Sequence, residues 1–149
     1  MVPFVVLIVL FVLFGALGRL HLPVAYGWWT SLRLALSGMF SLTASAHWGK
    51  RRPDLIRMVP TVFRWPDLLV TVTGILEIVG AVGLLLPASA RYAGLGLFLM
   101  LLAVFPANVH AAQERLTIAG REVERLIPRA LIQIVFLIAT LAVFLAGKH

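Results

Sequence analysis

Residues 74–112 read GILEIVGAVGLLLPASARYAGLGLFLMLLAVFPANVHAA, and this stretch decides the class of the protein. Two apolar runs are joined there by a turn too short to fold alone, and one carboxylate, Glu77, stands in the middle of the first run. A lone acid inside a membrane span costs about 3 kcal/mol on insertion scales, so it normally faces a protein partner or a cavity rather than lipid. The stretch therefore predicts two membrane helices and makes Glu77 the first candidate for a functional residue.

The composition also favours a membrane protein. Apolar residues make up 61% of the 149 residues and charged residues 13%, whereas a soluble domain has about 25% charged residues. The chain has no cysteine, which excludes disulfides, thiol redox catalysis and cysteine-ligated metal clusters. The net charge of +7 comes from basic residues between apolar runs rather than from a separate basic domain. We therefore expect anionic lipid headgroups, and no nucleic acid, as their partners.

Five apolar runs approach the ~20 residues that cross a hydrocarbon core of ~30 Å. The predicted spans are Val2–Gly18, Trp29–Trp48, Leu68–Leu86, Tyr92–His110 and Ile127–Leu145. The first is the shortest, and a secretory signal peptide is the alternative for it, although it lacks a cationic start and a good cleavage site. The sequence thus predicts an all-α, polytopic transmembrane helical bundle that forms one domain over residues 1–149.

The basic residues are distributed unequally between the two sides that five crossings define. One side receives Lys50, Arg51, Arg52, Arg57, Arg64, Arg115, Arg121, Arg125 and Arg129. The other side receives Arg19, Arg33, Arg91 and Lys148. The positive-inside rule assigns the richer side to the cytoplasm. We therefore expect a protein of the cytoplasmic (inner) membrane with its N-terminus inside and its C-terminus outside.

The two connections on the richer side differ in kind. Residues 49–66 (GKRRPDLIRMVPTVFRWP) mix bulky apolar side chains with arginines and three prolines. This pattern predicts an interfacial segment, which either dips back toward the bundle or forms a surface turn without a ligand role. Residues 113–125 (QERLTIAGREVER) alternate acids and bases and predict a solvated loop or helix end.

Helical spacing gathers polar residues on three of the spans. One face of the third span carries Val70, Thr73, Gly74, Glu77, Gly80, Ala81 and Leu84. Small residues flank the acid on this face, as in membrane helices that pack closely, so Glu77 is expected inside the bundle. The second span carries, at steps of four, Arg33, Ser37, Ser41 and Ser45, which we also expect to point inward. The fifth span contributes Gln133 and Thr140, seven residues apart and so on one face.

Three polar faces in one small bundle predict either a hydrogen-bonded core or a hydrated pocket. In the first case Glu77 bonds serines or backbone groups and only fixes the packing, whereas in the second it binds a ligand or a proton. The pocket hypothesis gives a set of candidate ligand-binding residues on different spans. They are Glu77, Ser41, Asn108, His110, Gln133 and His47.

Two of these candidates are histidines, His47 and His110, at the cytoplasmic ends of their spans. A pair at similar depth suits a metal or haem, but an interfacial histidine is more often an ordinary hydrogen-bonded side chain, and we assign no metal site. Glu77 lies ~15 Å along a straight helix from the cytoplasmic end of its span, so we do not expect it to share one site with both histidines. Pro106 removes a backbone hydrogen bond from the fourth span, and with Asn108 it is expected to form a polar notch open to the cytoplasm.

Four segments, in this order along the chain, carry a family resemblance. They are ASAHW at Ala44–Trp48, the proline-rich link ending in Trp65-Pro66, GILEIVGAVGLLLP at Gly74–Pro87 and FPANVHAA at Phe105–Ala112. Over residues 29–145 the chain resembles the DoxX-like family of small integral membrane proteins, which implies a four-helix bundle. The family is named after a subunit associated with a terminal quinol oxidase and thiosulfate:quinone oxidoreductase, but most members have no established activity, so the resemblance implies the fold more than a reaction. The chain departs from the family in its additional N-terminal span and in the sequence around His47, where relatives often have a glycine nearby and a phenylalanine next.

No soluble-enzyme signature occurs in the sequence, neither a nucleotide-binding glycine loop nor G-x-S-x-G nor HExxH. No catalytic residue is assigned, and whether the protein is an enzyme stays open. The leading hypothesis is an accessory subunit that binds a small hydrophobic molecule, a quinone or a lipid, or a partner membrane protein, through a polar pocket around Glu77. The alternative is a component of a quinone-linked membrane oxidoreductase, with a membrane redox enzyme or a second copy of the chain as partner. A proton-coupled transporter is a weaker alternative, because no inverted repeat is visible.

Overall fold

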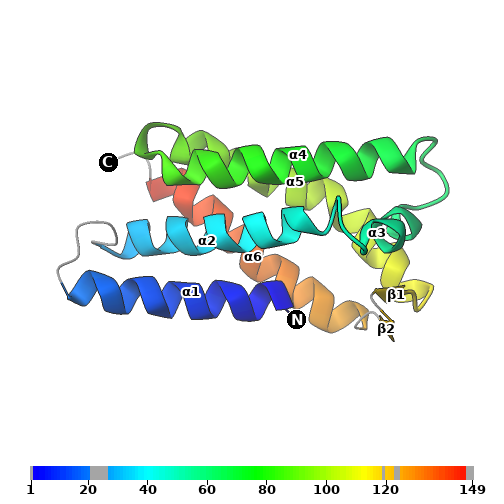
Figure 1. The fold of residues 1–149 in the computed structure, drawn as a ribbon, viewed down its shortest axis with the longest axis horizontal. Helices are drawn as coiled ribbons and strands as arrows, with labels where there is room; N and C mark the ends of the chain where they lie inside the picture. Colours follow the sequence, from blue (N-terminus) through cyan, green and yellow to red (C-terminus); the bar gives the residue numbers. More distant parts are fainter. Residues whose placement is uncertain (1, 21–26, 119, 123–124, 147–149) are drawn as a thin grey trace.

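The computed structural model describes residues 2–20, 27–118, 120–122 and 125–146, and these form an all-α helical bundle (Figure 1). This confirms the predicted fold class. The helices are α1 (Val2–Arg19), α2 (Trp28–Ser45), α3 (Arg52–Met58), α4 (Pro66–Leu85), α5 (Pro87–Gln113) and α6 (Leu126–Ala146). Two short strands, β1 (Thr117–Ile118) and β2 (Arg121–Glu122), pair antiparallel between α5 and α6.

The five long helices run alternately up and down, and α2 lies in the middle (Figure 1). It packs against α1, α4 and α6, while α5 packs against α4 and α6. Helices α2, α4, α5 and α6 therefore form a four-helix core, and α1 covers the outer side of α2. The short helix α3 lies at the end of the bundle where α2 ends and α4 begins.

Prolines and small residues set the tight geometry of the core. Pro66 and Pro87 stand in the first turns of α4 and α5, where the missing N–H costs nothing. Leu86 alone, in an extended conformation, separates the two helices. Gly94 in α5 faces the backbone of α6, because a Cβ there would lie 2.9 Å from the carbonyl oxygen of Thr140. Such contacts let membrane helices approach closely.

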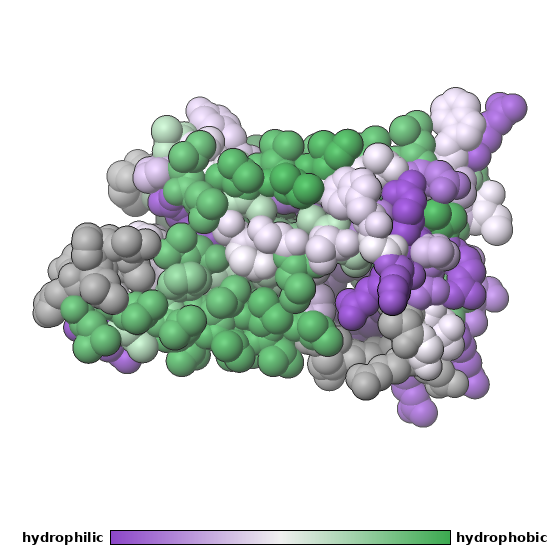
Figure 2. All heavy atoms as spheres, in the orientation of Figure 1, coloured by the Kyte–Doolittle hydropathy of each residue, from purple (hydrophilic) through white to green (hydrophobic). Residues whose placement is uncertain are grey.

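Four of the described helices, α1, α4, α5 and α6, are long and apolar enough to cross a membrane. Figure 2 shows an apolar surface along the bundle and hydrophilic residues gathered at the end that carries α3 and the strands. The protein is thus an integral membrane protein. The sequence predicted five spans. Helix α2 is the predicted span that is not apolar enough to be among the four, because it contains Arg33 and six serine and threonine residues. It is also the most enclosed of the long helices, so much of its polar surface faces protein rather than lipid.

The predicted inward face of α4 is confirmed. Its buried residues are Val70, Gly74, Gly80, Ala81 and Leu84. Thr73 and Glu77 on the same face are partly buried, and the opposite side of α4 exposes large apolar residues such as Ile75, Val79 and Val82. The shared face of α6 is confirmed as well, since Gln133 and Thr140 are buried with 6% and 0% of their surface exposed.

The polar stripe predicted on α2 is only half correct. Ser37 is buried and donates a hydrogen bond to the carbonyl oxygen of Ala81 at 2.8 Å. Arg33 reaches the end of α4, whereas Ser41 and Ser45 are exposed. At ~100° per residue, each step of four advances ~40° around the helix, so Ser45 lies ~120° away from Arg33. A row at steps of four therefore leaves the core after two residues.

The connections at the α3 end also differ from the prediction in detail. Helix α2 ends at Ser45, three residues before the predicted end of the span, and α3 follows in the proline-rich link. Helix α3 packs against α4 and α5 and buries Met58, so this segment does fold back onto the bundle. Helix α5 runs to Gln113, and Gly120, with φ of 76°, lies in the turn between the two strands, where a glycine is favoured.

Candidate functional site around His47 and Glu77

The structure brings His47 and Glu77 together between α2 and α4. The Nδ1 atom of His47 lies 3.8 Å from Oε2 of Glu77, and the two side chains are 11% and 13% exposed. The sequence predicted that Glu77 and the two histidines lie at different depths, and for His47 this was wrong. An acid and an imidazole therefore form a pair inside the bundle.

The error came from the unequal lengths of the helices. Helix α2 ends at Ser45, but α4 begins at Pro66, eight residues before Gly74, so it extends ~12 Å further along the bundle. His47 packs directly onto Gly74, where an added Cβ would lie 2.7 Å from the Cβ of His47. Since Glu77 lies about one turn beyond Gly74 on the same face, the histidine reaches the acid.

Arg52 at the start of α3 holds this end of α2 against α4. Its Nη1 donates to the carbonyl oxygen of His47 at 2.9 Å, and its Nη2 donates to Oγ1 of Thr71 at 2.9 Å. The same Nη2 donates at 3.3 Å to the carbonyl oxygen of Asp67. On the ring side, Nδ1 of His47 lies 3.3 Å from the carbonyl oxygen of Thr43. The backbone and the ring of His47 are thus both fixed by hydrogen bonds.

One carboxylate oxygen of Glu77 is left without a partner. Thr43 interacts with the carboxyl group, although its hydroxyl donates to the carbonyl oxygen of Phe40 at 3.0 Å. Among the residues that the structure describes, Oε2 of Glu77 is buried and has no hydrogen bond, because the 3.8 Å to His47 is too long for one. An unsatisfied polar atom in a membrane interior costs several kcal/mol. This oxygen is therefore a point where a ligand or water would gain a hydrogen bond.

A second polar cluster joins α5 to α6, and its side chains form hydrogen bonds with one another and with the backbone. Nδ2 of Asn108 donates to Oε1 of Gln133 at 2.6 Å, and Nε2 of Gln133 donates to the carbonyl oxygen of Leu101 at 2.5 Å. Nη2 of Arg129 donates to Oδ1 of Asn108. Both amide side chains are satisfied at donor and acceptor, so the cluster serves packing.

The polar notch predicted at Pro106 does not form as expected. Helix α5 continues through Pro106 to Gln113, and the Asn108 amide bonds α6 rather than a free carbonyl of its own helix. The reason is the close approach of α6, which places Gln133 within reach. Arg129 was missed, although it lies four residues before Gln133 and therefore on the same helical face.

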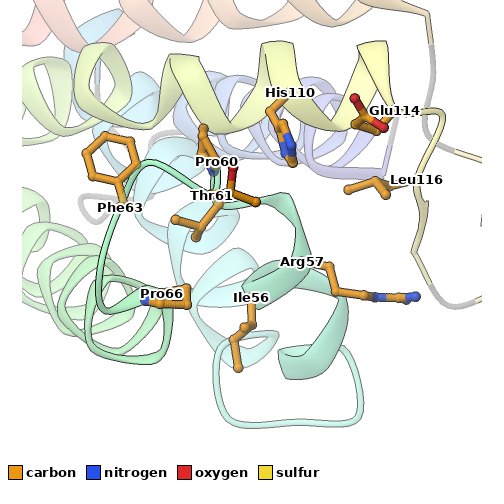
Figure 3. A pocket seen from close by; sticks show the side chains of 10 residues that line it. Ile56, Arg57, Pro60, Thr61, Phe63, Pro66, His110, Glu114 and Leu116 are labelled. Atoms are coloured by element: carbon orange, nitrogen blue, oxygen red, sulfur yellow. The ribbon is translucent and has the colours of Figure 1, made fainter.

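His110 belongs to a third place, an open pocket of about 720 Å³ at the α3 end of the bundle (Figure 3). Its Nδ1 lies 3.1 Å from the carbonyl oxygen of Met58. Pro60 and Thr61, from the link between α3 and α4, lie near it, and Glu114 follows it at the end of α5. Within the described residues, no group of three or more potential metal ligands occurs.

The six predicted site residues therefore occupy separate places. His47 and Glu77 meet between α2 and α4, Asn108 and Gln133 meet between α5 and α6, and His110 lines the end pocket. Ser41 is exposed on α2 and joins none of them. Sequence reasoning missed Thr43 and Arg52 at the site of His47 and Glu77. It placed Gly74 on the inward face of α4 but did not foresee that His47 packs on it. Arg52 gave no signal of this role, because it stands among other basic residues of the link.

One comparison with known proteins gives a match. A family model described as a domain of unknown function (DUF8561) matches residues 36–146, which include most of α2 and all of α3 to α6. The match begins after α1 and so corresponds to the four-helix core. No curated protein and no solved structure matches the chain.

Proposed function

The chain belongs to this DUF8561 family, and we propose that it is an accessory subunit of the cytoplasmic membrane that binds a small hydrophobic molecule at His47 and Glu77. The ligand classes that fit are a quinone and a lipid, each with a polar head and an apolar body. The resemblance to the DoxX-like family, which is named after a subunit associated with quinone-linked enzymes, supports the same proposal.

The unpartnered Oε2 atom of Glu77 is the observation that carries the proposal. The free Oε2 atom offers an acceptor beside the imidazole of His47, whose Nδ1 lies 3.8 Å away and already 3.3 Å from the carbonyl oxygen of Thr43. This suits a head group with a hydroxyl group that donates to the acid. The two side chains keep 11% and 13% of their surface exposed, whereas Oε2 itself is buried, so a head group would reach it through a local opening between α2 and α4. The apolar body would lie against the lipid-facing side of α4.

Glu77→Gln tests the proposal, because it keeps the shape of the side chain and removes the acid. We expect the protein purified in mild detergent to carry a quinone or lipid that organic extraction and mass spectrometry detect. The Glu77→Gln variant should retain at least tenfold less of it, at an unchanged helix content by circular dichroism. Glu114→Gln is the matched control, since it makes the same change at an exposed acid outside this site, and it should retain the full amount.

An equal amount of ligand in wild-type and Glu77→Gln protein would contradict the proposal and leave Glu77 a packing residue. A redox enzyme that copurifies with the wild-type chain would instead favour the alternative, a component of a quinone-linked oxidoreductase. The open pocket beside His110 favours such a partner, because it lies at the membrane surface and combines apolar side chains with Arg57 and Glu114. Proton-coupled transport remains the weaker alternative.

A further inference from the structure

A second pocket, of about 250 Å³, lies at the opposite end of the bundle from α3. Two arginines line it, Arg33 from α2 and Arg91 from α5, together with Trp29 and the last residue of α6, Ala146. Neither arginine takes part in the site at His47 and Glu77. The pocket therefore brings two cationic side chains together outside that site, and an anion is the ligand class that would bind both.

Part of the Arg33 guanidinium group caps the C-terminal end of α4. Its Nε donates to the carbonyl oxygen of Leu84 at 2.9 Å and its Nη2 to that of Leu85 at 3.0 Å. These carbonyls belong to the last turn of α4, whose C=O groups have no partner within the helix. The Nη1 group takes no part in either bond and stays available for a ligand.

Arg91 is less well satisfied than Arg33. Its guanidinium carbon lies 5.0 Å from the centroid of the Phe144 ring, a cation–π contact. Its Nε atom is buried and has no hydrogen-bond partner among the residues that the structure describes. A buried donor of this kind needs an acceptor from outside the described chain.

Within the described part of the chain, no acidic side chain pairs with Arg33 or Arg91. The six acids of the sequence are Asp54, Asp67, Glu77, Glu114, Glu122 and Glu124. Of the five that the structure describes, Asp54, Asp67, Glu114 and Glu122 belong to the α3 end of the bundle, in α3, the first turn of α4 or the segment that follows α5. Glu77 lies eight residues before Leu85, ~12 Å along the helix from this end. The described residues therefore supply no counter-charge at this end of the bundle, and an anion from outside them would find two guanidinium groups here.

Aromatic residues place this pocket at the level of lipid headgroups. Trp28, Trp29 and Tyr92 expose 63%, 50% and 71% of their surface at the same end, and exposed Trp and Tyr mark the membrane–water interface. The volume of about 250 Å³ is below the ~300–1,000 Å³ of pockets that enclose a whole small molecule. It suits a phosphate group with its neighbouring atoms, and guanidinium groups bind phosphate through paired hydrogen bonds.

We propose that Arg33 and Arg91 together bind the phosphate group of an anionic phospholipid at the end of the bundle opposite α3. The phosphate occupies the pocket, accepts hydrogen bonds from both guanidinium groups and supplies the missing negative charge. A free phosphate ion shares this chemistry, so the experiment separates the two sources.

The test measures binding of phosphatidylglycerol to the detergent-purified protein by native mass spectrometry. We expect the wild-type chain to bind it, and Arg91→Gln to weaken binding at least tenfold, because the variant removes the unpartnered donor. Arg91→Lys should recover only part of the affinity, since it restores the charge without the guanidinium fork. Arg91 is the residue of choice because Arg33 also caps α4.

Arg19→Gln is the control, because Arg19 is an exposed cation at the same end, in the last turn of α1. It should bind phosphatidylglycerol like the wild type, and an equal loss in Arg19→Gln and Arg91→Gln would overturn the proposal in favour of general surface charge. Equal binding of oleate, an anionic lipid without phosphate, would also overturn it. Inorganic phosphate that displaces the lipid only at tenfold higher concentration supports the lipid as source, and displacement at equal concentration supports the free ion.

Discussion

A single glycine decides whether His47 reaches Glu77. Gly74 offers no side chain, and His47 and the ring of Trp48 occupy the space where one would stand. The position therefore does more than let two helices approach, because it sets the depth at which a histidine from the end of α2 meets an acid in the middle of α4.

We expect Gly74→Ala to separate the pair. The added methyl group would lie 2.7 Å from the Cβ of His47 and 2.8 Å from the Trp48 ring, so the turn after α2 must shift at a cost of about 1–3 kcal/mol. Thermal unfolding in detergent measures the loss, and ligand retention should fall as in Glu77→Gln.

Gly96→Ala is the matched control for this substitution. Gly96 lies in α5, and a Cβ there would meet no atom within 4 Å, so its replacement should be neutral or stabilising by up to about 1 kcal/mol. Equal destabilisation by both substitutions would mean that Gly74 acts through the helix backbone rather than through His47.

At the scale of the helices, the polar atoms that hold α5 to α6 act as a closed network. Gln133 connects Asn108 to the Leu101 carbonyl, which places the best-satisfied polar cluster away from the acid. The network explains why α6 keeps a glutamine in an otherwise apolar stretch without any ligand there.

Gln133→Leu should destabilise the bundle by about 1–3 kcal/mol, because it strands the Asn108 amide and the Leu101 carbonyl in an apolar setting. The double variant Gln133→Leu, Asn108→Leu should recover little of this loss, since it removes the stranded amide but also takes the Asn108 acceptor from Arg129. Chemical or thermal unfolding in detergent measures both. A Gln133→Leu protein as stable as the wild type would show that the network carries no stability.

The helices also show how far the sequence predicts this fold. The face of α4 was predictable because small residues and Glu77 recur at true helical spacing. The face of α2 was not, because steps of four drift around the helix and Ser41 turns outward. The contact between His47 and Glu77 depends on where α2 ends relative to α4. That end lies beside a proline-rich link, where the packing of α3 against the bundle, rather than the local sequence, determines the last residue of the helix.

At the scale of the whole molecule, the basic residues define the two ends of the bundle. Both connections rich in arginine and lysine lie at the α3 end (Figure 1), which we propose faces the cytoplasm. Cysteines placed singly at Lys50 and Ala88, both exposed and at opposite ends, test this with an impermeant thiol reagent in intact cells. Position 88 should be labelled and position 50 protected, whereas the reverse pattern would contradict the orientation.

The position of α1 has a consequence for how the chain enters the membrane. Helix α2 alone lacks the apolar character of a span, while α1 is among the most apolar helices and packs along it. We infer that the two enter the bilayer as a hairpin, in which α1 lowers the cost of transferring Arg33 and the hydroxyl groups of α2 from water. A chain without residues 2–19 should then leave α2 on the cytoplasmic surface. A cysteine in place of the exposed Trp28, at the start of α2, should be labelled in the full chain and protected in the shortened one.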